Sequence, residues 1–194
     1  MSQSTQIRRL ETDRLFLRPF RKSDLDDLAA LNGEAENMKF VSPPLAREQV
    51  AGIIDWFIAE WKRLGYGWFA VTHKRTERLL GQCGLQEIED NTNLSTAELI
   101  FVIDRSVWGK GYATEAASAV VRFGFEAAGV EKIAAVAIKE NAPGRQVLVK
   151  LGFTHIGNRT LQDQEVMVYE MTKSSFVNQQ CWMPESSRDA SAKR

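Results

Sequence analysis

Gly109 and Gly111 stand on the two sides of Lys110. The types and spacing of these three residues suggest chemistry more clearly than any others in this sequence. An apolar run, residues 99–103, precedes them and is short enough to be a buried strand. Ala113 to Ala128 follow with apolar side chains at helical spacing. Glycine lets a phosphate approach the backbone closely, and a helix N-terminus carries unpaired N–H groups and partial positive charge. The stretch therefore predicts a phosphate-binding loop between a strand and a helix.

Two general phosphate-binding patterns compete for this loop. A P-loop requires G-x-x-x-x-G-K-S/T, which the spacing does not match. A dinucleotide-binding loop requires G-x-G-x-x-G. Gly109 and Gly111 match its first two glycines, Thr114 stands at the third, and Glu131 lies where that fold expects an acidic residue. That fold places the loop early in its domain, however, whereas about a hundred residues precede it here.

A third pattern fits the loop better. Residues 108–115, Trp-Gly-Lys-Gly-Tyr-Ala-Thr-Glu, closely resemble the acyl-CoA loop of the GNAT N-acetyltransferase superfamily, and most of all its ribosomal-protein N-terminal acetyltransferase branch. The superfamily loop reads Gln/Arg-x-x-Gly-x-Gly/Ala, and Trp108 replaces its Gln or Arg. The resemblance implies that acetyl-CoA is held here, chiefly by backbone donors, while Lys110 either touches a phosphate or is solvated. The implied cofactor-binding residues of the loop are Trp108, Gly109, Lys110, Gly111, Tyr112, Ala113 and Thr114.

A second stretch, Glu140 to Phe153, resembles the other CoA-binding element of that superfamily, an Asn-x-x-Ser before a helix that ends in Lys-x-Gly-Phe. Asn141 takes the position that contacts the pantetheine arm in the family, although an asparagine here also suits a plain helix cap. Gly144 stands where relatives often carry a serine that protonates the leaving thiolate, so the general acid is left unassigned. Arg145 could meet a CoA phosphate. The two motifs stand in the correct order and cover most of residues 97–157.

The resemblance implies transfer of an acetyl group from acetyl-CoA to a primary amine. The thioester is already activated, so no metal is required. The amine must lose a proton to a base, directly or through water, and the tetrahedral intermediate needs a backbone N–H for its oxyanion. In the family, that donor lies on the strand before the loop, where two parallel strands splay apart. Phe101, Val102 and Ile103 match that segment.

Glu98 is the candidate catalytic base. It is a carboxylate within an otherwise apolar strand, Ala-Glu-Leu-Ile, and burial would raise its pKa toward a useful value. The alternatives are a solvent-facing strand residue and a structural ion pair. Glu115 also lies near the loop, but the first turn of a helix favours any carboxylate, so its structural interpretation is preferred.

Composition excludes several classes of function. The chain has 194 residues, enough for one domain with a sizeable core, and 25 Lys+Arg balance 25 Asp+Glu. This balance gives no global basic field for nucleic acid, and no polybasic run suggests a membrane. Cys83 and Cys181 lie far apart, and His73 and His155 are in no metal-ligand pattern, so neither a disulfide framework nor a metal is expected. The lack of an apolar leader or membrane-length run predicts a cytoplasmic protein.

Apolar spacing predicts the elements that must position these residues. Strands are expected over residues 14–19, 68–72, 80–88, 97–103, 132–138, 153–157 and 166–171, and helices over 25–31, 47–64, 113–128 and 140–151. Gly81 and Gly84 predict a bulge or close backbone approach in the third strand. The mixed order predicts an α/β (α+β) domain. The resemblance implies a mostly antiparallel GNAT-type sheet with helices on both faces and a splayed parallel strand pair at the acyl-CoA site.

The domain boundaries follow from composition. Residues 1–9 are interpreted as a flexible lead, 10–172 as a single acetyltransferase domain, and 173–194 as a poorly ordered, polar tail. Four residues of that tail are an exception, because they could dock on the domain or on a second subunit. They are Phe176, Cys181, Trp182 and Met183.

The combined prediction is an N-acetyltransferase that uses acetyl-CoA and acts on a protein N-terminal α-amino group. The branch resemblance alone favours that acceptor, and a small-molecule amine is the alternative. A non-catalytic acyl-CoA sensor with the same fold also stays open, since Gly144 replaces the family serine. The protein is expected to be a monomer or homodimer whose partner is the amine acceptor, with no nucleic acid or membrane partner.

Overall fold

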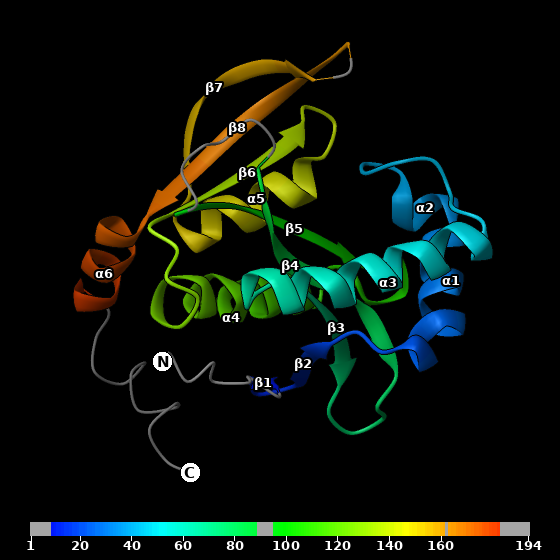
Figure 1. Cartoon of the computed structure of the whole chain (residues 1–194). Helices are drawn as coiled ribbons and strands as arrows, with labels where there is room; N and C mark the ends of the chain where they lie inside the picture. The colour runs from blue at the N-terminus through cyan, green and yellow to red at the C-terminus, as the bar shows by residue number, and fades with distance from the viewer. Residues whose placement is uncertain (1–8, 89–94, 162, 183–194) are drawn as a thin grey trace.

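The structure is a computed structural model that describes residues 9–88, 95–161 and 163–182, with side chains as far as residue 178. Within these ranges, the strands form an 8-stranded sheet in the order β1-β2-β3-β4-β5-β6-β8-β7 (Figure 1). Every neighbouring pair is antiparallel except β5 and β6, which are parallel, so the predicted mixed sheet is confirmed. The strands are β1 (Leu10–Glu11), β2 (Leu15–Pro19), β3 (Trp68–His73), β4 (Leu79–Glu87), β5 (Thr96–Ile103), β6 (Lys132–Ile138), β7 (Thr154–Leu161) and β8 (Gln164–Thr172).

The helices lie on both faces of this sheet. They are α1 (Leu25–Gly33), α2 (Ala35–Met38), α3 (Arg47–Leu64), α4 (Tyr112–Glu126), α5 (Ala142–Leu151) and α6 (Lys173–Trp182), with short 3-10 turns η1 (Lys22–Asp24) and η2 (Arg105–Val107). The predicted helices α1, α3, α4 and α5 are present, whereas β1, α2, α6 and the turns η1 and η2 have no counterpart in the prediction. Glycine ends α3, because Gly65 takes the left-handed φ of 75°. Of the described helices, none combines the length and apolarity needed to cross a bilayer.

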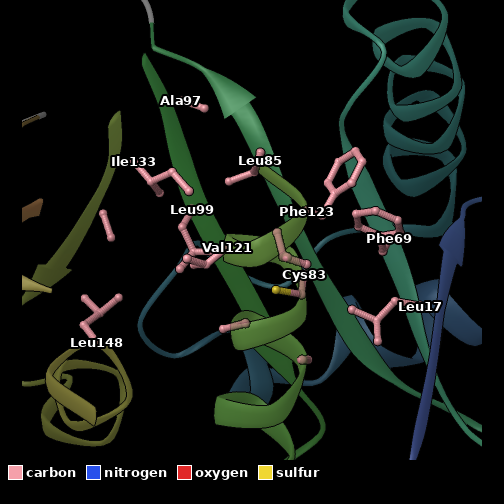
Figure 2. Close-up of a cluster of buried hydrophobic side chains, with 14 of the residues drawn as sticks. Leu17, Phe69, Cys83, Leu85, Ala97, Leu99, Val121, Phe123, Ile133 and Leu148 are labelled. Carbon is pink, nitrogen blue, oxygen red and sulfur yellow. The ribbon is translucent and has the colours of Figure 1, made fainter. Parts of the chain in front are cut away.

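The sheet lies between two apolar cores, which meet where Trp61 of α3 packs against Phe123 of α4 (ring centroids 5.9 Å apart). On one face, α4 packs against the strands, and Figure 2 shows Leu99 of the sheet beside Val121 of this helix. On the other face, α1 and α3 cover a core that includes Trp68 and is touched by Ile100. Side chains alternate along a strand, so Leu99 and its odd-numbered neighbours in β5 face α4, whereas even-numbered residues face α1 and α3.

The parallel pair β5–β6 is joined along only part of its length. Its register holds three residue pairs, Thr96 with Lys132, Ala97 with Ile133 and Glu98 with Ala134. Beyond Glu98 the two strands diverge, as Figure 1 shows, while β5 stays paired with β4 as far as Ile103. We call this point the fork. The splayed strand pair that the resemblance implied is therefore present.

Close packing explains the two glycines of β4. A Cβ on Gly84 would lie 2.6 Å from Trp68 Cα, and one on Gly81 would run into the Val102 carbonyl oxygen. The β3–β4 register also shifts between Val71 and Thr72. The predicted bulge and close backbone approach are both found.

Helix α6 corrects the expectation of irregular chain after residue 172. Thr172 and Ser175 cap its start reciprocally: Ser175 N–H donates to Thr172 Oγ1 (3.2 Å), and Thr172 N–H donates to Ser175 Oγ (3.1 Å). Phe176 packs on Phe125 of α4, with ring centroids 5.0 Å apart. One helix cap and one aromatic contact thus order this segment as a helix in spite of its polar composition. Residues 1–8 of the expected lead and 183–194 of the expected tail lie outside the described residues.

Phe176→Ala is expected to lower the free energy of unfolding by about 1–2 kcal/mol, because it removes a half-buried ring and its aromatic contact. Val177→Ala is the matched control, since that side chain is 52% exposed and its loss should matter by less than about 0.5 kcal/mol. Urea unfolding of both variants measures the difference. Equal effects would contradict anchoring through Phe176.

Candidate functional site

The glycine loop has a backbone that requires glycine. Gly109 and Gly111 have φ of 73° and 82°, in the left-handed region that other residues rarely adopt. Helix α4 begins at Tyr112, directly after them. Its first N–H groups have no acceptor within the helix, so they are free to bind an anion. The loop therefore has the geometry that its sequence predicts.

Two side chains fix this loop. The Trp108 indole Nε1–H donates to the Ile103 carbonyl at 2.6 Å. Arg14 Nη1 donates to the Lys110 carbonyl at 2.9 Å. The loop is thereby held against the end of β5 and against β2, and its backbone donors are preorganised.

Glu115 has a structural role at the start of α4. Its carboxylate accepts hydrogen bonds from Arg14 Nε (2.7 Å), from the Arg14 backbone N–H (2.8 Å) and from Thr12 Oγ1 (2.5 Å). Burial raises the pKa of Glu115, but the hydrogen bonds from Thr12 and Arg14 outweigh it and hold that pKa below its usual value. These contacts tie the start of α4 to the chain around β1 and β2, and they commit both carboxylate oxygens.

A cavity of about 240 Å³ adjoins the loop. Its walls come from the end of β5, from η2 and the glycine loop, from the first turn of α4, from α5 as far as Lys150, and from the segment at α2. Ten of the residues proposed from sequence line it. They are Phe101, Val102, Ile103, Trp108, Gly109, Gly111, Tyr112, Ala113, Thr114 and Asn141.

Lys110 and Arg145 do not line the cavity. The Lys110 side chain is exposed and folds back on η2, where Nζ donates to the Ser106 carbonyl at 3.4 Å. The Arg145 guanidinium donates through Nη2 to the Lys139 carbonyl at 3.0 Å, just before α5. Contact of either residue with a phosphate stays a prediction.

Asn141 both lines the cavity and caps α5. Its Oδ1 accepts from the Gly144 backbone N–H at 2.9 Å. A Cβ on Gly144 would lie 2.6 Å from Asn141 Nδ2, so a side chain at 144 would displace the asparagine from this position.

The sequence analysis missed the residues that α2 and the following turn contribute. Asn37, Phe40 and Val41 line the cavity. Asn37 is 8% exposed; its Oδ1 accepts from the Arg105 backbone N–H at 2.8 Å, and its Nδ2 donates to the Leu31 carbonyl at 3.1 Å. Arg105 also pairs with Glu36. These contacts join α2 to η2, so a segment far away in the sequence becomes a wall of the site.

Glu98 lies at the fork and does not line the cavity. It is the last residue of β5 that is paired with β6, and it is on the face of the sheet that carries Ile100. Its Oε2 accepts a hydrogen bond from Gln86 Nε2 at 3.1 Å. Burial raises the pKa of the Glu98 carboxyl, and the Gln86 hydrogen bond lowers it in part. The structure thus brings a half-buried carboxylate with raised basicity to the point where the strands separate.

Peptide groups of β5 face the gap beyond the fork. The Asp104 N–H donates to the Leu80 carbonyl at the start of β4 (2.7 Å), while the Ile103 carbonyl points the other way and accepts from the Trp108 indole. Alternation then directs the Phe101 peptide toward the gap, where β6 no longer pairs with it. A loop that can bind phosphate, a strand edge with a free N–H and a nearby carboxylate together suit a long phosphate-bearing thioester such as acetyl-CoA.

Comparison with known proteins agrees with this geometry. A family model described as "Acetyltransferase (GNAT) domain" matches residues 14–154. The uncharacterized N-acetyltransferase YoaA of Bacillus subtilis (strain 168) is 30% identical over 151 residues, which are 76% of this chain and 84% of that protein.

Two solved structures with coenzyme A share the fold. The ribosomal L7/L12 alpha-N-protein acetyltransferase RimL aligns with a TM-score of 0.73 and 17% identity, over 84% of this chain and 97% of its own. The aminoglycoside acetyltransferase AAC(6')-Ib aligns with a TM-score of 0.74 and 16% identity, over 86% of this chain and 99% of its own. The same architecture therefore holds coenzyme A in both neighbours.

Gly109→Ala is expected to raise the Kd for acetyl-CoA at least about tenfold, because the added methyl group narrows the place where the loop meets a phosphate. Gly129→Ala is the matched control: both glycines have φ of 73° and open space at the Cβ position. Gly129 lies between α4 and β6 and does not line the cavity. Each variant should lose about 1 kcal/mol of stability. Titration calorimetry measures the Kd for acetyl-CoA, and thermal melts measure the loss of stability. If Gly109→Ala and Gly129→Ala have the same Kd, the assignment of the loop is contradicted.

Proposed function

The chain belongs to the GNAT acetyltransferase family, and from this premise we propose that it acetylates the N-terminal α-amino group of a protein, with Glu98 as the general base. Family membership makes it an N-acetyltransferase that uses acetyl-CoA as co-substrate. The proposal adds the acceptor and the roles of individual residues. The position of Glu98 at the fork is the observation that carries it.

In this proposal, the glycine loop and the start of α4 hold the phosphates of acetyl-CoA. Gly109 and Gly111 give the backbone its anion-binding shape, and the α4 N–H groups donate to the phosphate oxygens. The Asn141 side chain contacts the pantetheine arm. The thioester then lies along β5, where the Phe101 N–H is the candidate oxyanion donor because β6 leaves it unpaired.

Glu98 removes the proton from the acceptor amine, directly or through one water. A carboxylate at its ordinary pKa is a weak base at neutral pH, and burial raises the pKa of Glu98. The side chain points to the face opposite α4, which leaves α4 and its loop to the coenzyme. The acceptor would thus approach the thioester from the α1 and α3 side.

The basicity of the acceptor favours an α-amino group. Its pKa of about 7.7–8.0 leaves a substantial neutral fraction at pH 7, whereas a lysine amine has a pKa of about 10.4. A single carboxylate is adequate for the former. RimL is described as an alpha-N-protein acetyltransferase, which supports the same class of acceptor.

Gly144 leaves the departing thiolate without a serine donor. A thiol has a pKa of about 8.5, so its thiolate is a tolerable leaving group near neutral pH and solvent can protonate it. Turnover therefore does not require the missing hydroxyl. Binding of acetyl-CoA without any turnover would instead favour the sensor alternative.

Acetyl transfer should be at least about tenfold more efficient, in kcat/KM, with peptides that carry a free N-terminus than with polyamines or aminoglycosides. A panel of peptides, their N-terminally blocked versions and these small amines measures it through release of free CoA thiol. Loss of activity on blocking the N-terminus is the matched control. A preference for small amines would assign the chain to the other acceptor class.

Glu98→Gln should lower kcat at pH 7 by at least about a hundredfold, since glutamine keeps the shape but cannot take the proton. Acetyl-CoA affinity should stay nearly unchanged, and the defect should shrink at high pH, where more of the amine is neutral. Glu170→Gln is the control. Glu170 lies directly opposite Ala134 on the same sheet face as Glu98, and it forms an ion pair with Lys132. Near-parental rates for Glu98→Gln at all pH values would show that another group is the base.

A further inference from the structure

A glutamine stands opposite Glu98 on the neighbouring strand. Gln86 of β4 and Glu98 of β5 are direct cross-strand partners, and their side chains share one face of the sheet. Both are half-buried. Gln86 Nε2 donates to Glu98 Oε2 at 3.1 Å. On the other side of Glu98, β6 offers Ala134, whose small side chain leaves the carboxylate room.

We infer that Gln86 is a positioning residue, whose amide holds the Glu98 carboxylate at the fork and leaves Oε1 as the oxygen that receives the proton. This rests on the proposed role of Glu98. Gln86 acts through Glu98, so its effect on the reaction is one of orientation and basicity.

A neutral donor suits this task better than a cation would. A nearby guanidinium or ammonium would lower the pKa of a carboxyl by about 1–3 units and weaken it as a base. An amide N–H restrains the carboxylate while it opposes only part of the effect of burial. Ion pairs lie on the flanking elements, and in one cluster Arg63 of α3 pairs with Glu60 of the same helix and with Glu87 of β4. Glu170 of β8 pairs with Lys132 of β6, and Glu36 of α2 pairs with Arg105 of η2.

The test compares Gln86→Met with Gln164→Met. Methionine keeps the length of glutamine but cannot donate, and Gln164 is an exposed β8 residue that undergoes the same chemical change. Gln86→Met should lower kcat at pH 7 about tenfold, the scale of one lost charge-assisted hydrogen bond. The acid limb of the pH–rate profile should move to higher pH, because the charged form of Glu98 loses a stabilising donor. The Kd for acetyl-CoA should not change, and Gln164→Met should behave as the parent.

Gln86→Glu is a second variant with the same shape as the parent. It places two carboxyl groups side by side, so the acid limb should move further toward high pH. In the Glu98→Gln background, Gln86→Met should add no further loss of kcat, because there is no base left to position. Losses that multiply in the double variant would instead indicate a merely structural effect and overturn the inference.

Carbon-13 NMR titration of the Glu98 carboxyl tests the role of Gln86 independently of whether Glu98 is the general base. The Glu98 carboxyl should titrate at higher pH in Gln86→Met than in the parent. An unchanged titration overturns the inference, whatever the catalytic result. If Glu98→Gln retains near-parental rates while the titration still moves, the failure belongs to the proposed base, and Gln86 remains the residue that sets the ionisation of Glu98.

Discussion

The fork between β5 and β6 is the constraint on which the rest of the site depends. Pairing stops after Glu98 and Ala134, and this leaves peptide groups of β5 directed into a gap within the sheet. Backbone N–H and C=O groups in a protein interior must find partners. The Ile103 carbonyl finds one in the Trp108 indole, and the remaining groups border a cavity. A ligand with polar groups along its length is the natural partner for such an edge.

The elements around the fork are held by a few long-range polar contacts. Glu115 ties the start of α4 to Arg14 and Thr12, so the helix end that faces the cavity cannot slide along the sheet. Asn37 ties α2 to η2 through the Arg105 N–H. Each contact includes a backbone N–H, that of Arg14 donating to Glu115 and that of Arg105 donating to Asn37, and a backbone donor loses no side-chain rotamer freedom when it is engaged. Together these contacts hold segments that are far apart in the chain in place as the walls of the cavity.

The regular elements could be predicted from the sequence, because their signals are local. Helix α3 has its apolar residues at helical spacing and stops at Gly65, and its bounds are those expected. The glycine loop was recognisable because Gly109 and Gly111 adopt a backbone that other residues resist.

The rest of the site depends on tertiary contacts that no local pattern encodes. Helix α2 has four residues, too few for a periodic signal, so the role of Asn37 was invisible. A glutamine in a strand, such as Gln86, carries no signal until the register sets it opposite a carboxylate. Helix α6 was missed because one ring, that of Phe176, outweighs a polar composition.

The open edge beyond the fork also has a consequence for aggregation. A strand with unpaired peptide groups is a template on which another chain can add a strand, and proteins shield such edges with charges, prolines or bulges. In this fold the bare stretch of β5 borders a cavity walled by α2, α4 and α5, so the approach of a foreign strand is blocked by helices and not by its own sequence. Residues 99–103 can therefore all be apolar, as the core on both faces requires, without making the ligand-free molecule a seed for intermolecular β-sheet.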